Sequence, residues 1–178
     1  MSETEATAVG GERTYGGLPG SFRYSFHQSD SRLYRSYAVV SGLLGLLITA
    51  LVGLGLIVWI FQTADQSALV TLVRSFLVLV GLLIVIPLFA PVLFVARRHR
   101  KRFDVDERYD VALAAGGYCY VASLYVGLVI TVPPDQQTTP AAAIAPIVEL
   151  LYALPPAVGL IPPVLAAIGI YALHRRFR

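Results

Sequence analysis

The most constraining feature of this sequence is the segment from Ala38 to Phe61, which contains no charged residue. A helix needs about 20 apolar residues to cross a hydrocarbon core of about 30 Å, because it rises about 1.5 Å per residue. The segment meets this requirement. We therefore predict a membrane-spanning helix here, and we expect the rest of the chain to fold in a membrane as well.

The composition agrees with that expectation. Hydrophobic residues make up 56% of the chain and charged residues only 14%, whereas a soluble domain carries about 25% charged residues. The 178 residues leave room for one domain. We assign residues 31–178 to a single transmembrane domain and residues 1–30 to a cytoplasmic, partly disordered tail.

Three further apolar stretches follow the first: Leu69–Ala96, Val111–Val132 and Ala141–Leu173. The four stretches predict spans at about residues 38–61, 72–96, 111–132 and 157–173. Pro87 and Pro91 predict a kink in the second span. The expected fold class is an all-α membrane protein with about four transmembrane helices in an up-down bundle.

The last apolar stretch is irregular, because it is too long for one span and too short for two. It also contains five prolines: Pro146, Pro155, Pro156, Pro162 and Pro163. Two arrangements are open: one broken and kinked helix, or a short helix at the outer surface (about residues 142–154) followed by the fourth span. We prefer the second, because a residue before proline disfavours helix and two successive prolines end one.

The positive charges indicate the orientation of the chain. All Lys and Arg residues except Arg74 lie before the first apolar stretch, in the connection after the second stretch, or at the C-terminus. The other two connections contain Asp65 and Asp135 and neither Lys nor Arg. The positive-inside rule then places the N-terminus and the C-terminus in the cytoplasm. We expect a multi-pass plasma membrane protein whose basic segments contact anionic lipid headgroups.

Four strings of the sequence carry a resemblance. They are Ser29–Tyr37 (SDSRLYRSY), Ala96–Arg100 (ARRHR), Ala122–Gly127 (ASLYVG) and Glu149–Tyr152 (ELLY). Together they resemble an uncharacterised family of small four-helix integral membrane proteins from halophilic archaea, over nearly the whole chain from Tyr15. The resemblance implies a four-helix membrane fold and no particular activity.

Small residues recur at every fourth position on two of the predicted spans. The two rows are Ser41, Gly45, Thr49 and Gly53 on the first span, and Ala115, Cys119, Ser123 and Gly127 on the third. In lipid, such rows let two helix backbones approach closely. We interpret both as helix-packing ridges. Whether they meet within one chain or between copies in a homo-oligomer is left open.

Two isolated charges accompany the apolar stretches. Arg74 lies near the outer end of the second span, and Glu149 lies within the last apolar stretch. An unpaired charge in hydrocarbon costs about 2.5 to 3.5 kcal/mol even on insertion scales. The alternatives are an interfacial ion pair between Arg74 and Glu149, simple exposure of both at the interface, or a site for a polar substrate or ion.

The remaining polar residues predict neither a catalytic centre nor a cofactor or metal site. No HExxH, GxSxG or P-loop pattern occurs. His27, His99 and His174 lie outside or at the edges of the spans, so they do not form an intramembrane haem ligand pair. The start of the third helix, where anions are favoured, explains the acidic residues Asp104, Asp106, Glu107 and Asp110.

The expected function is that of a non-enzymatic accessory or scaffold module of a membrane assembly. Its partners would be the bilayer and either further copies of itself or another membrane protein, with no nucleic acid. The alternative is a small oligomeric transporter or channel, since broken helices expose backbone groups to substrates. A membrane-embedded enzyme acting on lipid is the weakest of the three.

Overall fold

The computed structural model describes Gly20, Phe22 and residues 31–62, 68–101 and 107–177, with the backbone alone at 68–71 and 101. These residues form helices and no strand. The elements are α2 (Arg32–Gln62), α3 (Ala68–Lys101), α4 (Glu107–Ile130), η1 (Pro134–Gln136), α5 (Ala145–Tyr152), η2 (Pro156–Leu160) and α6 (Ile161–Arg176). The predicted tail, residues 1–30, lies outside the described residues apart from Gly20 and Phe22.

Four helices of the described chain are long and apolar enough to cross a membrane. They are Arg32–Gln62, Leu72–Arg100, Glu107–Ile130 and Pro156–Arg176. The prediction of an all-helical chain with four such helices is therefore confirmed. Their length and composition suggest a multi-pass membrane protein.

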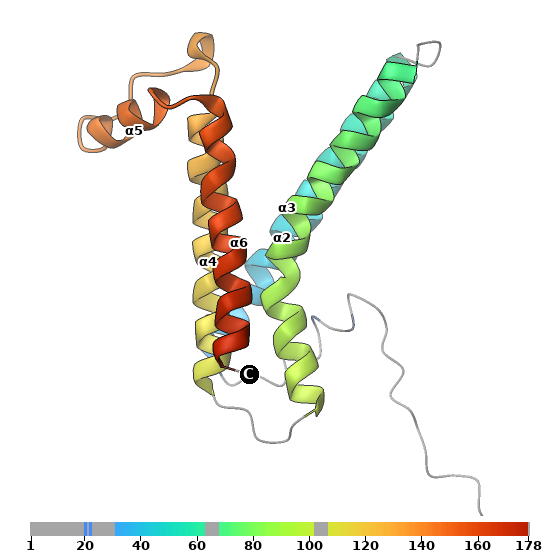
Figure 1. Cartoon of the computed structure of the whole chain (residues 1–178), viewed down its shortest axis with the longest axis vertical. Coiled ribbons are helices and arrows are strands. Elements are labelled where there is room, and N and C mark those ends of the chain that lie inside the picture. The colour runs from blue at the N-terminus through green and yellow to red at the C-terminus, as the bar shows by residue number, and fades with distance from the viewer. Residues whose placement is uncertain (1–19, 21, 23–30, 63–67, 102–106, 178) are drawn as a thin grey trace, which may run out of the picture.

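The helices form two arms. α2 packs along α3, and α4 packs along α6. The two arms contact each other through α2, α3, α4 and α6 in one half of the molecule and diverge in the other half, which gives the V shape in Figure 1. Figure 1 also shows α3 changing direction about halfway along its length.

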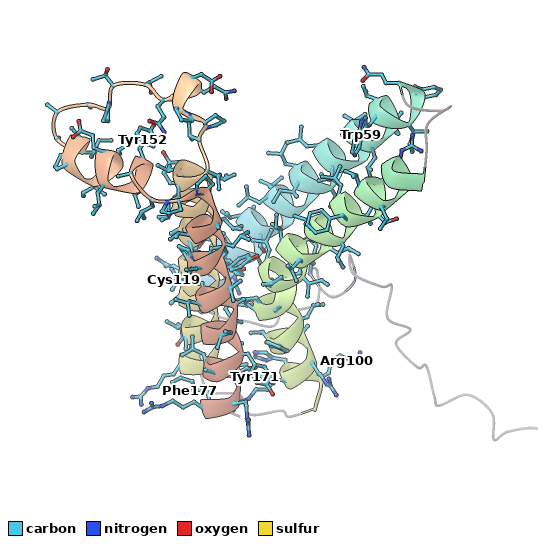
Figure 2. All side chains as sticks on the ribbon, turned by 45° about the horizontal axis from the view of Figure 1, so that its top comes forward. Trp59, Arg100, Cys119, Tyr152, Tyr171 and Phe177 are labelled. Carbon is cyan, nitrogen blue, oxygen red and sulfur yellow. The ribbon has the colours of Figure 1, made fainter. Side chains whose placement is uncertain are left out.

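One end of the molecule is rich in arginine, and we call it the basic end. α2 and α4 begin there and α3 and α6 finish there, so it collects the exposed residues Arg32, Arg97, Arg100, Arg108, Arg175 and Arg176. Figure 2 shows Arg100 and Phe177 at this end. Trp59 on α2 and Tyr152 on α5 lie at the opposite end.

The core lies where the arms meet. Its buried members include the tyrosines Tyr34, Tyr37, Tyr109 and Tyr120 and the aliphatic residues Leu88, Val92, Val95, Leu113 and Ile170. Beyond this core, apolar side chains cover the outside of the arms; Leu46 on α2 is 68% exposed and Leu83 on α3 is 64% exposed. Hydrocarbon accepts such a surface, whereas tyrosine hydroxyls need partners inside the protein.

The last apolar stretch forms two separate helices in this structure. α5 ends at Tyr152, and Pro155 and Pro156 follow before η2 and α6. Pro162 and Pro163 lie in the first turn of α6, where the missing amide hydrogen breaks no intrahelical hydrogen bond. These two prolines therefore leave α6 continuous.

Candidate functional site

Pro87 and Pro91 lie inside α3 rather than at its ends. Proline has no amide hydrogen, and its ring crowds the carbonyl group four residues earlier, so the helix opens locally around it. In an apolar environment, carbonyl groups near such a proline need donors from neighbouring helices. Pro87 and Pro91 remove the intrahelical donors of the carbonyl groups four residues earlier. Tyrosine hydroxyls of α2 and α4 donate to the next carbonyl groups along α3, those of Ile84 and Leu88.

Two tyrosine hydroxyls donate hydrogen bonds to carbonyl oxygens of α3. Tyr37 of α2 donates to Leu88 at 2.6 Å, and Tyr120 of α4 donates to Ile84 at 2.9 Å. The two acceptors are one turn apart, so they lie on the same side of α3. α2 and α4 are thereby joined to the proline-containing part of the helix between them.

Tyr34 lies one turn before Tyr37 on α2 and is also fully buried. Its hydroxyl makes a longer contact, 3.5 Å, with the carbonyl oxygen of Val92. Val92 is one turn beyond Leu88, so the tyrosine contacts continue along the same side of α3. We call Tyr34, Tyr37 and Tyr120 the tyrosine cluster.

The position of the Tyr37 ring depends on Gly117 of α4. A Cβ atom at position 117 would overlap the Tyr37 ring, so a larger residue there would push α2 and α4 apart. Tyr118 packs edge-on against Tyr37, with ring centroids 5.3 Å apart. The Tyr118 hydroxyl also lies 2.8 Å from the hydroxyl of Ser36. The contact between α2 and α4 is thus aromatic and polar at once.

A second cluster lies at the basic end and begins with a buried carboxylate. Asp110, in the first turn of α4, is 2% exposed. Its oxygens lie 3.0 and 3.3 Å from Nε2 of His99 on α3. Burying a carboxylate is costly unless it is paired and hydrogen-bonded. The pair therefore stabilises the contact between α3 and α4 at this end.

His174 brings α6 into the same cluster. Its ring stacks on Phe94 of α3, with centroids 4.1 Å apart and planes 13° from parallel. Its Nδ1 atom lies 2.7 Å from the hydroxyl oxygen of Tyr109 on α4, within hydrogen-bond distance. One histidine of α6 thus contacts both α3 and α4 at the basic end.

Arg98 of α3 completes the cluster. Its guanidinium lies over the Tyr109 ring, 4.1 Å from the centroid, where a cation is attracted by the ring quadrupole. The same group donates a hydrogen bond to the carbonyl oxygen of Phe177, just after α6. A cation is favoured at this helix end by the negative pole of its dipole. We call Phe94, Arg98, His99, Tyr109, Asp110 and His174 the basic-end cluster.

Both clusters supply polar contacts between helices. In the described parts of the chain, no group of three or more His, Cys, Asp and Glu side chains is arranged to hold a metal ion. The tyrosine cluster fixes α3 between α2 and α4, and the basic-end cluster fixes α3, α4 and α6 at one end. The two arms are thus joined in the half of the molecule that contains the core.

The predicted ridge on α2 has two different parts. Ser41 and Gly45 are buried, and a Cβ atom at Gly45 would overlap the Phe89 ring of α3. Thr49 is exposed and donates a hydrogen bond to the carbonyl oxygen of Gly45 at 2.7 Å. Gly53 has no heavy atom within 4 Å of its Cβ position. In this structure, only the half of the ridge near the basic end contacts another helix closely.

The predicted ridge on α4 is also divided. Ala115 and Cys119 are exposed, whereas Ser123 is half-buried and donates to the carbonyl oxygen of Tyr120 at 2.7 Å. Gly127 is buried, and a Cβ atom there would overlap the carbonyl oxygen of Gly159 in η2. The two predicted ridges do not face each other along their length.

The structure does not bring Arg74 and Glu149 together. Arg74 is half-buried on α3 and interacts with another group, whereas Glu149 is exposed on α5. α5 contacts α4, and Figure 1 shows it at the end of the α4–α6 arm, apart from the start of α3. Among the described residues, no ion pair joins these two side chains.

Several residues that position the helices were not singled out by sequence reasoning. Gly117 and Gly159 lie at close helix contacts, and Tyr37, Tyr120 and the His99–Asp110 pair supply the buried polar contacts. The available signal was the presence of tyrosine hydroxyls and a carboxylate within or beside apolar stretches, since such groups need partners in lipid.

Span-length apolar helices, apolar outer faces and polar contacts directed inward suggest a polytopic α-helical membrane protein. The chain belongs to the family described as Domain of unknown function (DUF8056), whose model matches residues 1–178. This agrees with the resemblance to an uncharacterised family. No curated protein and no solved structure matches the chain.

Proposed function

We propose that this protein is a non-enzymatic accessory or scaffold module of a membrane assembly. The observation that carries this proposal is the use of the buried polar groups. Tyr37 and Tyr120 are bonded to the backbone of α3, and Asp110 is bonded to His99. Groups engaged in this way hold helices in place, so this part of the molecule supports a structural role.

The proposed module lies in the plasma membrane as an up-down bundle with the basic end in the cytoplasm. Exposed arginines from all four long helices gather at that end, and the positive-inside rule favours the cytoplasmic side for them. They would contact anionic lipid headgroups, each with about 1 kcal/mol of attraction near the surface. Both termini are then cytoplasmic.

The diverging arms support the scaffold role more directly. In the half away from the basic end, α2 and α3 pack on each other and leave wide apolar faces, including Leu54 on α2 at 61% exposure. Helices of a partner protein, or of another copy of this chain, can pack on such faces in the bilayer. The internal contacts of the buried groups Tyr37, Tyr120 and Asp110 also suit this role.

The test is site-specific photocrosslinking of the full chain in native membranes. A photoreactive residue at Leu54 on α2 is compared with one at Leu165 on α6, a matched position that is also 61% exposed. For an accessory module, we expect a protein adduct of defined mass at one or both positions. We also expect a complex of fixed stoichiometry in mild detergent. Adducts with lipid alone at both positions would contradict the proposal.

The transporter alternative makes a different prediction. A transporter would need the proline region of α3 to release its carbonyl groups to a substrate, yet tyrosine hydroxyls occupy those of Ile84 and Leu88. Ion or solute flux through purified protein in proteoliposomes, lost on Asp110→Ala, would overturn the accessory role in favour of transport.

A further inference from the structure

The short helix α5 has an unusual place in the molecule. It follows the end of α4 at Ile130 and precedes the start of α6 at Ile161. Figure 1 shows it lying across the direction of the α4–α6 arm, at the end opposite the basic end. α5 therefore lies at the level where two span-length helices end, which is the level of a membrane–water interface if the chain is embedded.

The faces of α5 differ in chemistry. Val148 and Leu151 are half-buried, whereas Ile147 and Leu150 are 63% and 66% exposed. Glu149 is exposed as well. Successive helical residues are about 100° apart, so Glu149 points nearly opposite to Ile147. α5 thus has one side on the protein, one exposed apolar side and one acidic side.

The neighbouring elements also expose apolar residues. Leu160 in η2 is 68% exposed, and Ile161 and Leu165 in α6 are 52% and 61% exposed. If α6 spans the bilayer, these residues meet lipid. The polar residues Asp135 and Gln136 of η1 are exposed at the same end. Apolar and polar residues are thus both exposed at this end of the molecule.

We infer that α5 is an interfacial anchor whose Ile147–Leu150 side inserts into the bilayer between headgroups and acyl chains. The occupant of this surface is lipid, because α5 lies across the arm at the level where the span-length helices α4 and α6 end (Figure 1), and its acidic side points away from Ile147. An amphipathic helix at an interface buries its apolar face about 5–10 Å deep. This inference rests on membrane embedding and is independent of the accessory role.

The anchor would complement the basic end. Arginines hold one end of the α4–α6 arm at one headgroup layer, and α5 would hold the other end at the opposite layer. Both contacts resist movement of the arm along the bilayer normal. The end of the α2–α3 arm carries no corresponding helix among the described residues, so the two arms would differ in how firmly their depth is fixed.

The experiment uses tryptophan fluorescence of the full chain in phosphatidylcholine vesicles. Trp59 is the single tryptophan, so Trp59→Phe provides a background into which Ile147→Trp or, as matched control, Glu149→Trp is introduced. Brominated acyl chains quench a nearby indole. We expect Ile147→Trp to lose emission when bromine is placed near the headgroups, and to emit at shorter wavelength than Glu149→Trp.

Three results would overturn the inference. One is equal quenching at positions 147 and 149. A second is blue-shifted emission at 147 that bromination leaves unchanged, which would indicate a protein partner on that side. The third is stronger quenching by bromine at the chain ends than near the headgroups, which would place α5 inside the bilayer. Unchanged helix content by circular dichroism ensures that both variants are compared in the folded state.

Discussion

The hydroxyl group of Tyr37 on α2 donates a 2.6 Å hydrogen bond to the carbonyl oxygen of Leu88 on α3, between Pro87 and Pro91. The tyrosine is fully buried, so the bond forms without competition from water. It connects a helix weakened by two prolines to its neighbour, and it accounts for the presence of a polar group in the core of an apolar chain.

Tyr37→Phe removes the hydroxyl group that donates to the carbonyl oxygen of Leu88. A buried hydrogen bond contributes about 0.5–1.5 kcal/mol net, so we expect a measurable fall in thermal stability in detergent. Tyr125→Phe is the control, because Tyr125 is 70% exposed and its hydroxyl should contribute little. Equal melting temperatures for the two variants would show that the Tyr37 bond does not stabilise the fold.

Gly117→Ala tests the contact between α2 and α4. The new methyl group would overlap the Tyr37 ring, and overpacking of this kind costs about 1–3 kcal/mol. Gly53→Ala is the control, since nothing lies within 4 Å of its Cβ position; alanine should be neutral or up to about 1 kcal/mol stabilising in a helix. Thermal unfolding in detergent gives the comparison, and a Gly117→Ala protein as stable as Gly53→Ala would contradict this packing.

The four long helices were predictable because bilayer thickness fixes the length of an apolar span. The stretch from Ala38 to Phe61 and its three successors correspond to α2, α3, α4 and α6. Proline spacing also indicated that the last stretch is irregular, and α5 and α6 are separate helices in the structure. These features depend on chain-local properties, which a single sequence displays.

Helix faces were harder to predict. A span is apolar on all sides, so its sequence does not mark which side meets protein and which meets lipid. Spacing four on α4 pointed to Ala115 and Cys119, which are exposed, whereas the close contact with Tyr37 is made by Gly117. Several small residues of α4 satisfy the packing pattern, and only the tertiary arrangement selects among them.

The buried contact between His99 and Asp110 was missed for a different reason. Asp110 lies at the start of α4, where an acidic residue is expected from the helix dipole alone. Its second role depends on His99, which is on another helix, and on how α3 and α4 pack. Because the helix dipole already explained Asp110, nothing in the sequence pointed to its contact with His99 on another helix.

Cysteine labelling tests the proposed orientation. In a Cys119→Ser background, Gln136→Cys lies in η1, and Arg176→Cys lies at the basic end; both residues are exposed. An impermeant maleimide added to sealed cells should label the first and not the second, because the basic end is proposed to be cytoplasmic. Permeabilised cells should label both. The opposite pattern in sealed cells would reverse the topology.

The pair between His99 and Asp110 can be measured with a double-mutant cycle. Asp110 is buried and His99 nearly so, and removing either leaves the other without its partner. We expect His99→Ala and Asp110→Ala each to lower the free energy of unfolding by about 1–3 kcal/mol. The double variant should lose less than the sum, with a coupling of about 0.5–3 kcal/mol.

The control cycle combines His99→Ala with Asp135→Ala in place of Asp110→Ala. Asp135 is exposed in η1 at the opposite end of the molecule (Figure 1). Distant sites with no shared partner usually show additive effects, so His99→Ala and Asp135→Ala should add. Chemical unfolding of purified protein in one detergent gives all the free energies. Additivity in both cycles would mean that the contact between His99 and Asp110 contributes nothing to holding α3 on α4, and the basic-end cluster would then depend on the contacts of His174 and Arg98.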